Sequence, residues 1–167
     1  MVDQFSPVCA VTLQSAAGCS RARVQQAGAI CFRISADSSP EVLLLASRRN
    51  GRWGIPKGRI ETGETSGVAA AREAMEEAGV RGRISNDALG SFVYMKDSSD
   101  LTYHLDVHLL EVQETLLDFP ERRSRKLRWA PLENAVQEVS HPKLRDLLLL
   151  LAGNLEIGCL LGGNLSP

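Results

Sequence analysis

The sequence predicts one domain with an α/β sandwich fold. Short apolar segments alternate along the chain with segments of helical periodicity. The length of 167 residues suits a single domain that buries a sizeable core. We expect a flexible N-terminal segment at residues 1–23, the folded domain at 24–152 and a C-terminal tail at 153–167.

Strands are expected where short apolar runs are bounded by turn-forming residues. These runs lie at residues 27–34, 41–47, 83–85, 89–95, 101–112 and 127–130, with a brief extended piece at 53–56. The first two should form a hairpin, because Asp, Ser and Pro in the turn at 36–40 favour chain reversal. In the run at 101–112, apolar residues alternate with His104, Asp106 and His108, which predicts one apolar and one polar face.

Helices are expected at residues 66–78, 131–139 and 142–151. The last two begin at prolines, which suit the first turn because an N–H there has no partner within the helix. Gly79 is the expected C-cap of the first helix. A glycine-rich loop is expected to connect the extended piece at 53–56 to that helix.

The helix at 66–78 carries three carboxylates on one side. At about 100° per residue, Glu73, Glu76 and Glu77 fall within an arc of roughly 100°. The opposite side is expected to pack on the core through Val68, Ala71, Met75 and Ala78. Ordinary Arg/Glu pairs on a solvated helix are the alternative explanation of the acidic side.

A bound cation would offset the repulsion between the carboxylates on this side of the helix. Like charges about 5 Å apart repel by roughly 3 kcal/mol at an effective dielectric constant near 20. A divalent cation converts that repulsion into coordination, and Mg²⁺, with Mn²⁺ as the substitute, prefers carboxylate and water oxygens. The acidic helix therefore predicts a magnesium site.

Residues 58–80 join this helix to the preceding loop in a recognisable pattern. They read Gly, five residues, Glu, seven residues, Arg-Glu-apolar-x-Glu-Glu-x-Gly-apolar, which resembles the Nudix box of the Nudix hydrolases. The matching residues are Gly58, Glu64, Arg72, Glu73, Ala74, Glu76, Glu77, Gly79 and Val80. The resemblance implies a Nudix α/β/α sandwich with a mixed sheet.

The resemblance also implies roles for the three helical glutamates. Glu73, Glu76 and Glu77 would supply the metal ligands and carry catalysis, and one of them could instead act as the general base. Some members of the family recruit the base from a loop outside the box, for which Glu111 and Glu114 are the candidates in this sequence.

The remaining box residues suit supporting roles in metal-assisted attack of water on a phosphoanhydride. Gly58 lets the backbone approach closely and could offer its carbonyl to the metal. Arg72 is well placed to tether a neighbouring glutamate, and Glu64 would orient the loop and the start of the helix.

Basic residues ahead of the box are candidates for phosphate binding. Lys57 immediately precedes Gly58, where a fixed cation could neutralise a phosphate, and the alternative is an ordinary solvated lysine. Arg48, Arg49 and Arg52 lie on the preceding turn, and at least one should face the same cleft.

The resemblance extends from about residue 25 to 151 and is closest to the diphosphoinositol polyphosphate phosphohydrolases. That branch cleaves diphosphoinositol polyphosphates and diadenosine polyphosphates. By resemblance, four residues occupy positions that could contact substrate phosphates: Ser47, Arg49, Arg125 and Lys143. Lys57 stands where that branch usually has glycine, and Gln26 stands where a further cation is expected, so a dinucleotide substrate is an equal candidate.

The predicted function is metal-dependent hydrolysis of a phosphoanhydride bond in a diadenosine polyphosphate or diphosphoinositol polyphosphate. One alternative is a pyrophosphohydrolase of other nucleotides, nucleotide sugars or RNA 5′ ends. A second is a Nudix-fold ligand sensor without catalysis, against which the intact set of glutamates argues.

The composition limits the partners. Lys and Arg number 19 against 20 Asp and Glu, which argues against a general binder of nucleic acid or membrane surfaces. Cys9, Cys19, Cys31 and Cys159 lack metal-ligand spacing, so free thiols in the cytoplasm are expected. We expect a small-molecule polyphosphate as partner, no nucleic acid, no membrane, and a monomer or homodimer.

Overall fold

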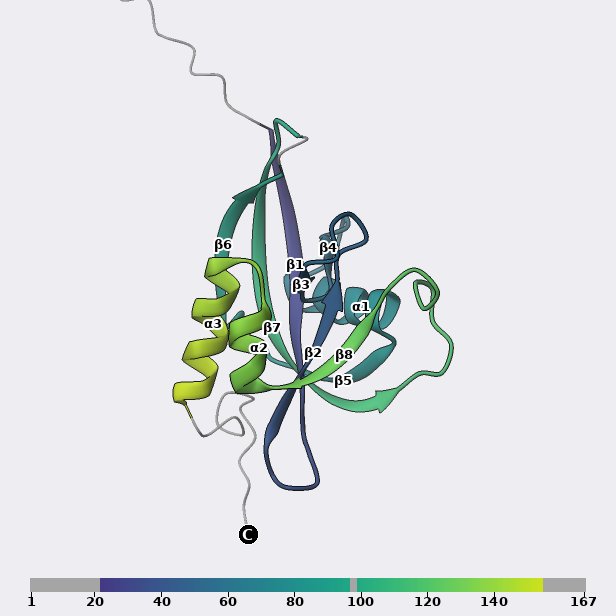
Figure 1. Ribbon diagram of the computed structural model, residues 1–167. Coiled ribbons are helices and arrows are strands. Elements are labelled where there is room, and N and C mark those ends of the chain that lie inside the picture. Colours follow the sequence, from purple (N-terminus) through teal and green to yellow (C-terminus); the bar gives the residue numbers. More distant parts are fainter. Residues whose placement is uncertain (1–21, 97–98, 155–167) are drawn as a thin grey trace, which may run out of the picture.

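The computed structural model describes residues 22–96 and 99–154 (Figure 1). Most of the predicted N-terminal segment at 1–23 and of the predicted tail at 153–167 lies outside the described residues. Of the four cysteines, only Cys31 is described, and it is free and buried. None of the described helices is long and apolar enough to span a bilayer.

Two long strands, β1 (Arg23–Ile34) and β7 (Thr102–Thr115), run parallel through the centre of one mixed sheet. The other strands are β2 (Pro40–Ala46), β3 (Trp53–Gly54), β4 (Lys57–Arg59), β5 (Val80–Ile84), β6 (Gly90–Met95) and β8 (Leu127–Pro131). The order is β3-β2-β1-β7-β5, with β4 on β1, β6 on β7 and β8 on β2. All neighbours other than β1 and β7 pair antiparallel.

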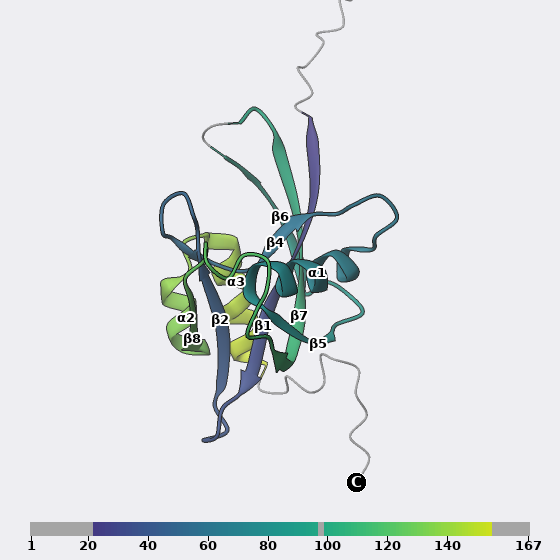
Figure 2. The ribbon, with the colours of Figure 1, turned by 90° about the vertical axis from the view of Figure 1, so that its right-hand side faces the viewer.

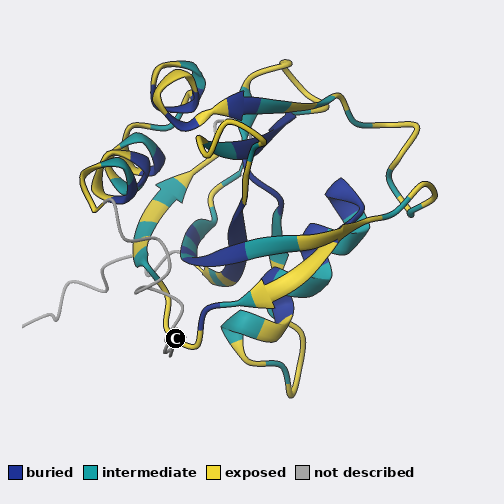
Figure 3. Cartoon of the chain, turned by 90° about the horizontal axis from the view of Figure 1, so that it is seen from below, coloured by how far each residue is buried: buried dark blue, intermediate teal, exposed yellow. Residues whose placement is uncertain are grey.

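Helices cover both faces of this sheet (Figures 1 and 2). Helix α1 (Ser66–Ala78) packs on one face over small residues, among them Ala27, Ala29 and Cys31. Helices α2 (Leu132–Glu138) and α3 (Pro142–Gly153) cover the other face, where the core is larger. Figure 3 shows the buried residues concentrated in the central strands and on the inner sides of the helices. The predicted α/β/α sandwich with a mixed sheet is confirmed.

The predicted hairpin and box helix are confirmed. Strands β1 and β2 pair antiparallel, with Phe32 opposite Val42. Helix α1 begins after Thr65, whose hydroxyl accepts from the Val68 N–H at 3.3 Å, and ends at Gly79 in the left-handed conformation. Both caps satisfy backbone groups that a helix end leaves without partners.

The glycine-rich loop contains a strand that the sequence did not indicate. In β4, Lys57 pairs with Gly28 and Gly58 with Ala27 of β1. Three residues without apolar alternation carry no strand signal of their own, so pairing with β1 determines their conformation. This pairing fixes the backbone of Lys57 and Gly58 beside α1.

The predicted core side of α1 is wrong for Val68, whose side chain is 56% exposed, while Met75 is only half-buried. The side of α1 that faces the sheet instead carries alanines together with Glu73 and Glu77, which are 9% and 8% exposed. Alanines bring the helix close to the sheet, and two of the acidic residues are therefore buried with them.

The predicted polar face of the strand at 101–112 is wrong at His108, which is only 2% exposed. Its Nε2 lies 2.9 Å from the Ser66 hydroxyl, and its Nδ1 lies 3.2 Å from the Ser85 carbonyl oxygen. The central strand β7 is covered by helices on both faces. At His108 the start of α1 covers the face that the alternation predicted to be exposed to solvent.

Gly79→Ala should destabilise the fold more than Gly63→Ala. Both glycines have positive φ, 65° and 87°, so each alanine costs roughly 1 kcal/mol in backbone strain. At Gly79 a Cβ would also overlap the Phe119 ring, whereas nothing lies within 4 Å at Gly63. Chemical denaturation of both variants checks this, and equal losses of unfolding free energy would show that Phe119 imposes no restriction.

Candidate active site

Strand β4 and helix α1 bring the box carboxylates against the backbone of the preceding loop. The Lys57 N–H donates to Glu77 Oε2 at 3.0 Å. A Cβ added at Gly58 would overlap the Glu73 carboxylate. Only glycine therefore allows Glu73 to lie against β4.

Arg72 connects the box residues to one another. Its Nε donates to Glu64 Oε1 at 2.8 Å, and its Nη1 donates to Glu73 Oε1 at 2.8 Å and lies 3.3 Å from Glu76 Oε2. Its Nη2 also donates to the Arg59 carbonyl oxygen at 2.9 Å. Arg72 thus ties the start of the box to the acidic part of α1, as the sequence indicated.

A further glutamate, Glu121, which the sequence did not indicate, lies beside these box residues. The Glu121 N–H donates to the Glu76 carbonyl oxygen at 3.0 Å, and its carboxylate accepts from Arg125 Nε at 2.7 Å. Arg48 also pairs with Glu121 at 3.3 Å. Arg125 reaches across to form an ion pair with Glu77.

Burial opposes charge on the residues at the centre of this network. Desolvation raises the pKa of Glu73, with Arg72 acting in the opposite direction. Desolvation also raises the pKa of Glu77, opposed by the Lys57 N–H and by Arg125. The pKa of Lys57 is lowered mainly by desolvation, while Glu77 acts to raise it. The charged forms of Glu73, Glu77 and Lys57 are therefore each stabilised by an oppositely charged or hydrogen-bonding neighbour.

The donor set suits a hard divalent cation. Glu73, Glu76 and Glu77 offer carboxylate oxygens and Gly58 a backbone carbonyl, which are ligands that Mg²⁺ prefers. Within residues 22–96 and 99–154, no three acidic, histidine or cysteine side chains converge on one point. Arg72 and Arg125 instead pair with these carboxylates. A cation at this cluster would take over part of the charge compensation that the two arginines provide.

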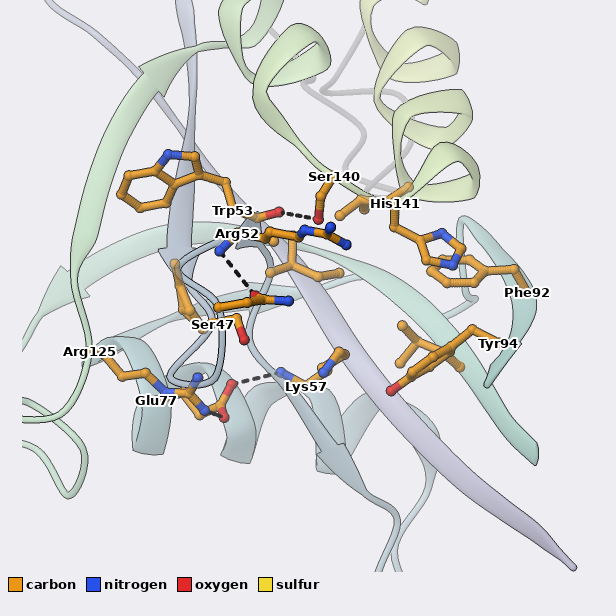
Figure 4. Close-up of a pocket in the computed structure, with 16 residues that line it drawn as sticks. Ser47, Arg52, Trp53, Lys57, Glu77, Phe92, Tyr94, Arg125, Ser140 and His141 are labelled. Atoms are coloured by element: carbon orange, nitrogen blue, oxygen red, sulfur yellow. Dashed lines mark hydrogen bonds and ion pairs between the residues drawn. The ribbon is translucent and has the colours of Figure 1, made fainter. Parts of the chain in front are cut away.

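A cavity of about 260 Å³ opens beside the cluster (Figure 4). Its lining is Leu45, Ser47, Asn50, Arg52, Trp53, Gly54, Ile55, Lys57, Glu77, Phe92, Tyr94, Leu105, Arg125, Ser140, His141 and Leu144. The cavity therefore brings together segments from β2 through α3 that are distant in the sequence.

Four of the six residues expected to bind substrate line this cavity: Ser47, Arg52, Lys57 and Arg125. Arg49 and Lys143 are not part of its lining in the described structure. Lys143 lies on α3 with a side chain that is 66% exposed, 3.5 Å from Asp146. The N–H of Arg49 donates to the Ser47 hydroxyl at 3.3 Å within the turn after β2.

The two glutamates that the sequence suggested as a general base from outside the box do not line the described cavity. Glu111 and Glu114 are on β7 beside β5, and Glu111 pairs with Arg83 at 2.8 Å. Neither glutamate is part of the described cavity lining. Glu121 is the acidic residue outside the box that contacts both α1 and Arg125. It lies in the loop between β7 and β8 and belongs to no sequence motif, so no local pattern could have indicated it.

An aromatic wall is the second feature that the sequence reasoning missed. Phe92 and Tyr94 of β6 meet His141, which precedes α3, and the rings of Phe92 and His141 stack with centroids 4.5 Å apart. Alternation in β6 could have indicated that Phe92 and Tyr94 share a face. Contact with His141 depends on how α3 folds back onto the sheet.

Glu64→Gln should lower the melting temperature at pH 7. Hydrogen bonds from Arg72 lower the pKa of Glu64 from 4.5 to about 2. A lowered pKa stabilises the folded state above the unfolded value of about 4.5, and this stability is lost as the pH falls toward 2. Thermal unfolding between pH 7 and pH 3 should therefore show a shrinking difference from the parent.

Glu61→Gln is the matched control, because this exposed glutamate lies on the same loop. It should leave the melting temperature nearly unchanged across this range. A difference between parent and Glu64→Gln that stays constant or grows on acidification would contradict the assigned Arg72–Glu64 interaction.

Known proteins resemble this chain over most of its length. The NUDIX domain matches residues 24–151. Diphosphoinositol polyphosphate phosphohydrolase 3-beta of Bos taurus is 39% identical over 116 residues, covering 68% of this chain and 67% of the bovine protein. Nudix hydrolase 16, mitochondrial, of Arabidopsis thaliana is 36% identical over 115 residues, covering 65% of this chain and 63% of the plant protein. The chain thus spans about two thirds of these relatives.

Solved structures share the fold. A binary complex of a C. elegans Ap4A hydrolase has a TM-score of 0.60 at 26% identity, covering 78% of this chain and 98% of that one. The NUDIX domain of Shewanella oneidensis NrtR, in a cocrystal with ADP ribose, has a TM-score of 0.63 at 18% identity, covering 81% and 90%. The sandwich, the box geometry and the match over residues 24–151 agree, and the chain belongs to the Nudix hydrolase family.

Proposed function

We propose that this protein is a Mg²⁺-dependent hydrolase of a phosphoanhydride bond in a diadenosine polyphosphate or diphosphoinositol polyphosphate type of substrate. One observation carries the proposal. Glu77 of the acidic cluster and three cations, Arg52, Lys57 and Arg125, line the same cavity. A polyphosphate chain requires this combination, since its oxygens must be neutralised by side chains and metal together.

Glu73, Glu76 and Glu77, with the Gly58 carbonyl, would hold the metal. When bound, Mg²⁺ supplies charge neutralisation at the phosphate oxygens and lowers the pKa of coordinated water. Lys57, Arg52 and Arg125 bind and orient the phosphates, and the Ser47 hydroxyl adds a donor. Arg49 and Lys143 lie outside the cavity lining, so we assign them to parts of a longer substrate that extend beyond it.

In the reaction, the oxygen of a water molecule attacks phosphorus while the bridging P–O bond breaks. The products are two phosphate compounds, and a carboxylate accepts the proton that the water loses. The three glutamates of the box helix are candidates for this base, and Glu121 is our candidate from outside the box. The Glu121 carboxylate forms ion pairs with Arg125 and Arg48. If Glu121 is the base, Glu121→Gln should lower turnover and leave Mg²⁺ affinity unchanged.

A pyrophosphohydrolase of nucleotide sugars or RNA 5′ ends would use the same cluster and differ in what the cavity accepts. A ligand sensor would bind polyphosphate and release no product. Chromatography of the products formed from a panel of these substrates, with and without Mg²⁺, together with calorimetric measurement of binding, distinguishes the three. We expect turnover of a polyphosphate only when Mg²⁺ is present, and binding without turnover of any substrate would establish the sensor instead.

We further propose that the protein acts in the cytoplasm as a monomer or homodimer on a small molecule, with no nucleic acid as partner. The nearly balanced charge of the chain supports a small-molecule partner.

A further inference from the structure

Both carboxylate oxygens of Glu77 are already engaged by neighbouring groups (Figure 4). Oε2 accepts from the Lys57 N–H at 3.0 Å, and Oε1 forms the ion pair with Arg125 Nη2. The side chains of Arg125 and Glu77 are 11% and 10% exposed, so each charge depends on this contact more than the charges of a surface pair do. A divalent cation on Glu77 would lie close to the guanidinium of Arg125 and be repelled by it. The cation and Arg125 should therefore compete for Glu77.

Arg125 is anchored at one side of its guanidinium and exchangeable at the other. Its Nε donates to Glu121 Oε2 at 2.7 Å. Glu121 is itself held in place, because its N–H donates to the Glu76 carbonyl oxygen and its carboxylate pairs with Arg48. Nη2, which contacts Glu77, belongs to a side chain that also lines the cavity. Arg125 can thus exchange Glu77 for an anion in the cavity while its Nε stays on Glu121.

Arg72, the other arginine that pairs with the box carboxylates, is held differently. Its Nε and Nη2 donate to the Glu64 carboxylate at 2.8 and 3.0 Å, and its Nη2 also donates to the Arg59 carbonyl oxygen. Arg72 is not part of the described cavity lining. It fixes the box loop to α1, whereas Arg125 faces both a carboxylate of the cluster and the cavity.

We propose that Arg125 couples the binding of the divalent cation to the binding of substrate phosphate. Glu77 exchanges Arg125 for the cation, and the released Nη2 of Arg125 pairs with phosphate in the cavity. This inference rests on the proposed function and adds a regulation of the same site. A buried arginine that loses an anionic partner is destabilised, so phosphate favours its release from Glu77. Because coupling between two ligands is reciprocal, phosphate should raise the affinity for the cation, and the cation should raise the affinity for phosphate.

The test measures Mn²⁺ affinity by electron paramagnetic resonance in the parent, in Arg125→Gln and in two control variants, with and without saturating inorganic phosphate. Arg48→Gln removes a neighbouring cation that pairs with Glu121. Arg52→Gln removes another cation of the cavity lining. Solutions of Mn²⁺ and phosphate without protein correct for the ions that phosphate binds by itself.

Without phosphate, Arg125→Gln should bind Mn²⁺ about fivefold or more tightly than the parent, as expected for the loss of a direct competitor. Arg48→Gln and Arg52→Gln should stay close to the parent, because neither removes the ion pair with Glu77. With saturating phosphate, the difference between the parent and Arg125→Gln should disappear, because phosphate has already drawn Arg125 away from Glu77.

Two results of this titration would overturn the coupling. One is equal Mn²⁺ affinity of the parent and Arg125→Gln without phosphate. The other is a difference that saturating phosphate leaves unchanged, because a change in net charge near the site would account for it without any exchange of partners.

A crystal structure of the parent with Mn²⁺ and inorganic phosphate tests the exchange without relying on a variant that could fail to fold. We expect Glu77 to contact the metal, Arg125 Nη2 to contact phosphate, and Arg125 Nε to remain on Glu121. An ion pair between Arg125 and Glu77 that persists beside the bound metal would refute the proposal.

The coupling and the proposed function fail in different ways. If the parent and Arg125→Gln bind Mn²⁺ equally while turnover requires Mg²⁺, the hydrolase stands and the coupling is wrong. If Arg125→Gln binds Mn²⁺ more tightly, phosphate removes the difference and no substrate of the panel is hydrolysed, the coupling stands and the hydrolase fails.

Discussion

Glu77→Gln is expected to lower kcat/KM in Mg²⁺ on the order of 10³-fold in a folded protein. Loss of one carboxylate from the proposed metal site removes several kcal/mol of charge stabilisation at the transition state, and each 1.36 kcal/mol corresponds to about tenfold in rate. The fold should tolerate the change, because glutamine keeps the shape of the Glu77 side chain and Arg125 retains its hydrogen bond to the Glu121 carboxylate. The amide oxygen can still accept from the Lys57 N–H.

Glu76→Gln should have a similar kinetic effect, since it changes the same cluster on α1. Glu133→Gln, at an exposed position in the first turn of α2, is the control and should keep the parent rate. Circular dichroism and steady-state kinetics on the best substrate provide the comparison. Parent-like turnover in folded Glu76→Gln and Glu77→Gln would refute the assignment of these glutamates.

Gly58→Ala should nearly abolish activity, also on the order of 10³-fold, because the added methyl group would occupy the place of the Glu73 carboxylate. Glu73 must then move away from β4, and the Gly58 carbonyl and the Glu73 side chain can no longer lie together. Mg²⁺ affinity should fall with activity. The variant should also lose stability, because overpacking a tight contact typically costs about 1–3 kcal/mol.

Gly67→Ala is the matched control for this substitution. Gly67 lies in the first turn of α1, where the nearest atom to an added Cβ is 3.6 Å away, an ordinary contact. Alanine should leave activity unchanged and could stabilise the helix by about 0.5–1 kcal/mol. If Gly58→Ala retains parent Mg²⁺ affinity and turnover, the close approach of Glu73 to β4 has no role in catalysis.

The sequence predicted correctly those elements and contacts that local signals determine. The 3.6-residue period, the cap at Gly79 and the turn at 36–40 predicted α1 and the first hairpin. The spacing of the box predicted that Arg72 would tether a glutamate, which it does at Glu64 and Glu73. These features depend on residues that are close in the sequence.

The remaining features depend on tertiary packing. The β4 strand exists because β1 pairs with it, and Glu73 and Glu77 are buried because alanines bring α1 close to the sheet. The aromatic wall needs α3 to return to β6, and Glu121 reaches α1 through the loop before β8. A single sequence contains no local signal for such long-range contacts.

The account rests on the acidic cluster of α1 binding a hard divalent cation. The most direct measurement is titration of the purified protein with Mn²⁺, with free ion measured by electron paramagnetic resonance and Mg²⁺ added as competitor. We predict Mn²⁺ binding at submillimolar concentrations, displacement by Mg²⁺, and loss of the site in Glu77→Gln. A correctly folded parent protein that leaves all Mn²⁺ free at millimolar concentrations would contradict the account.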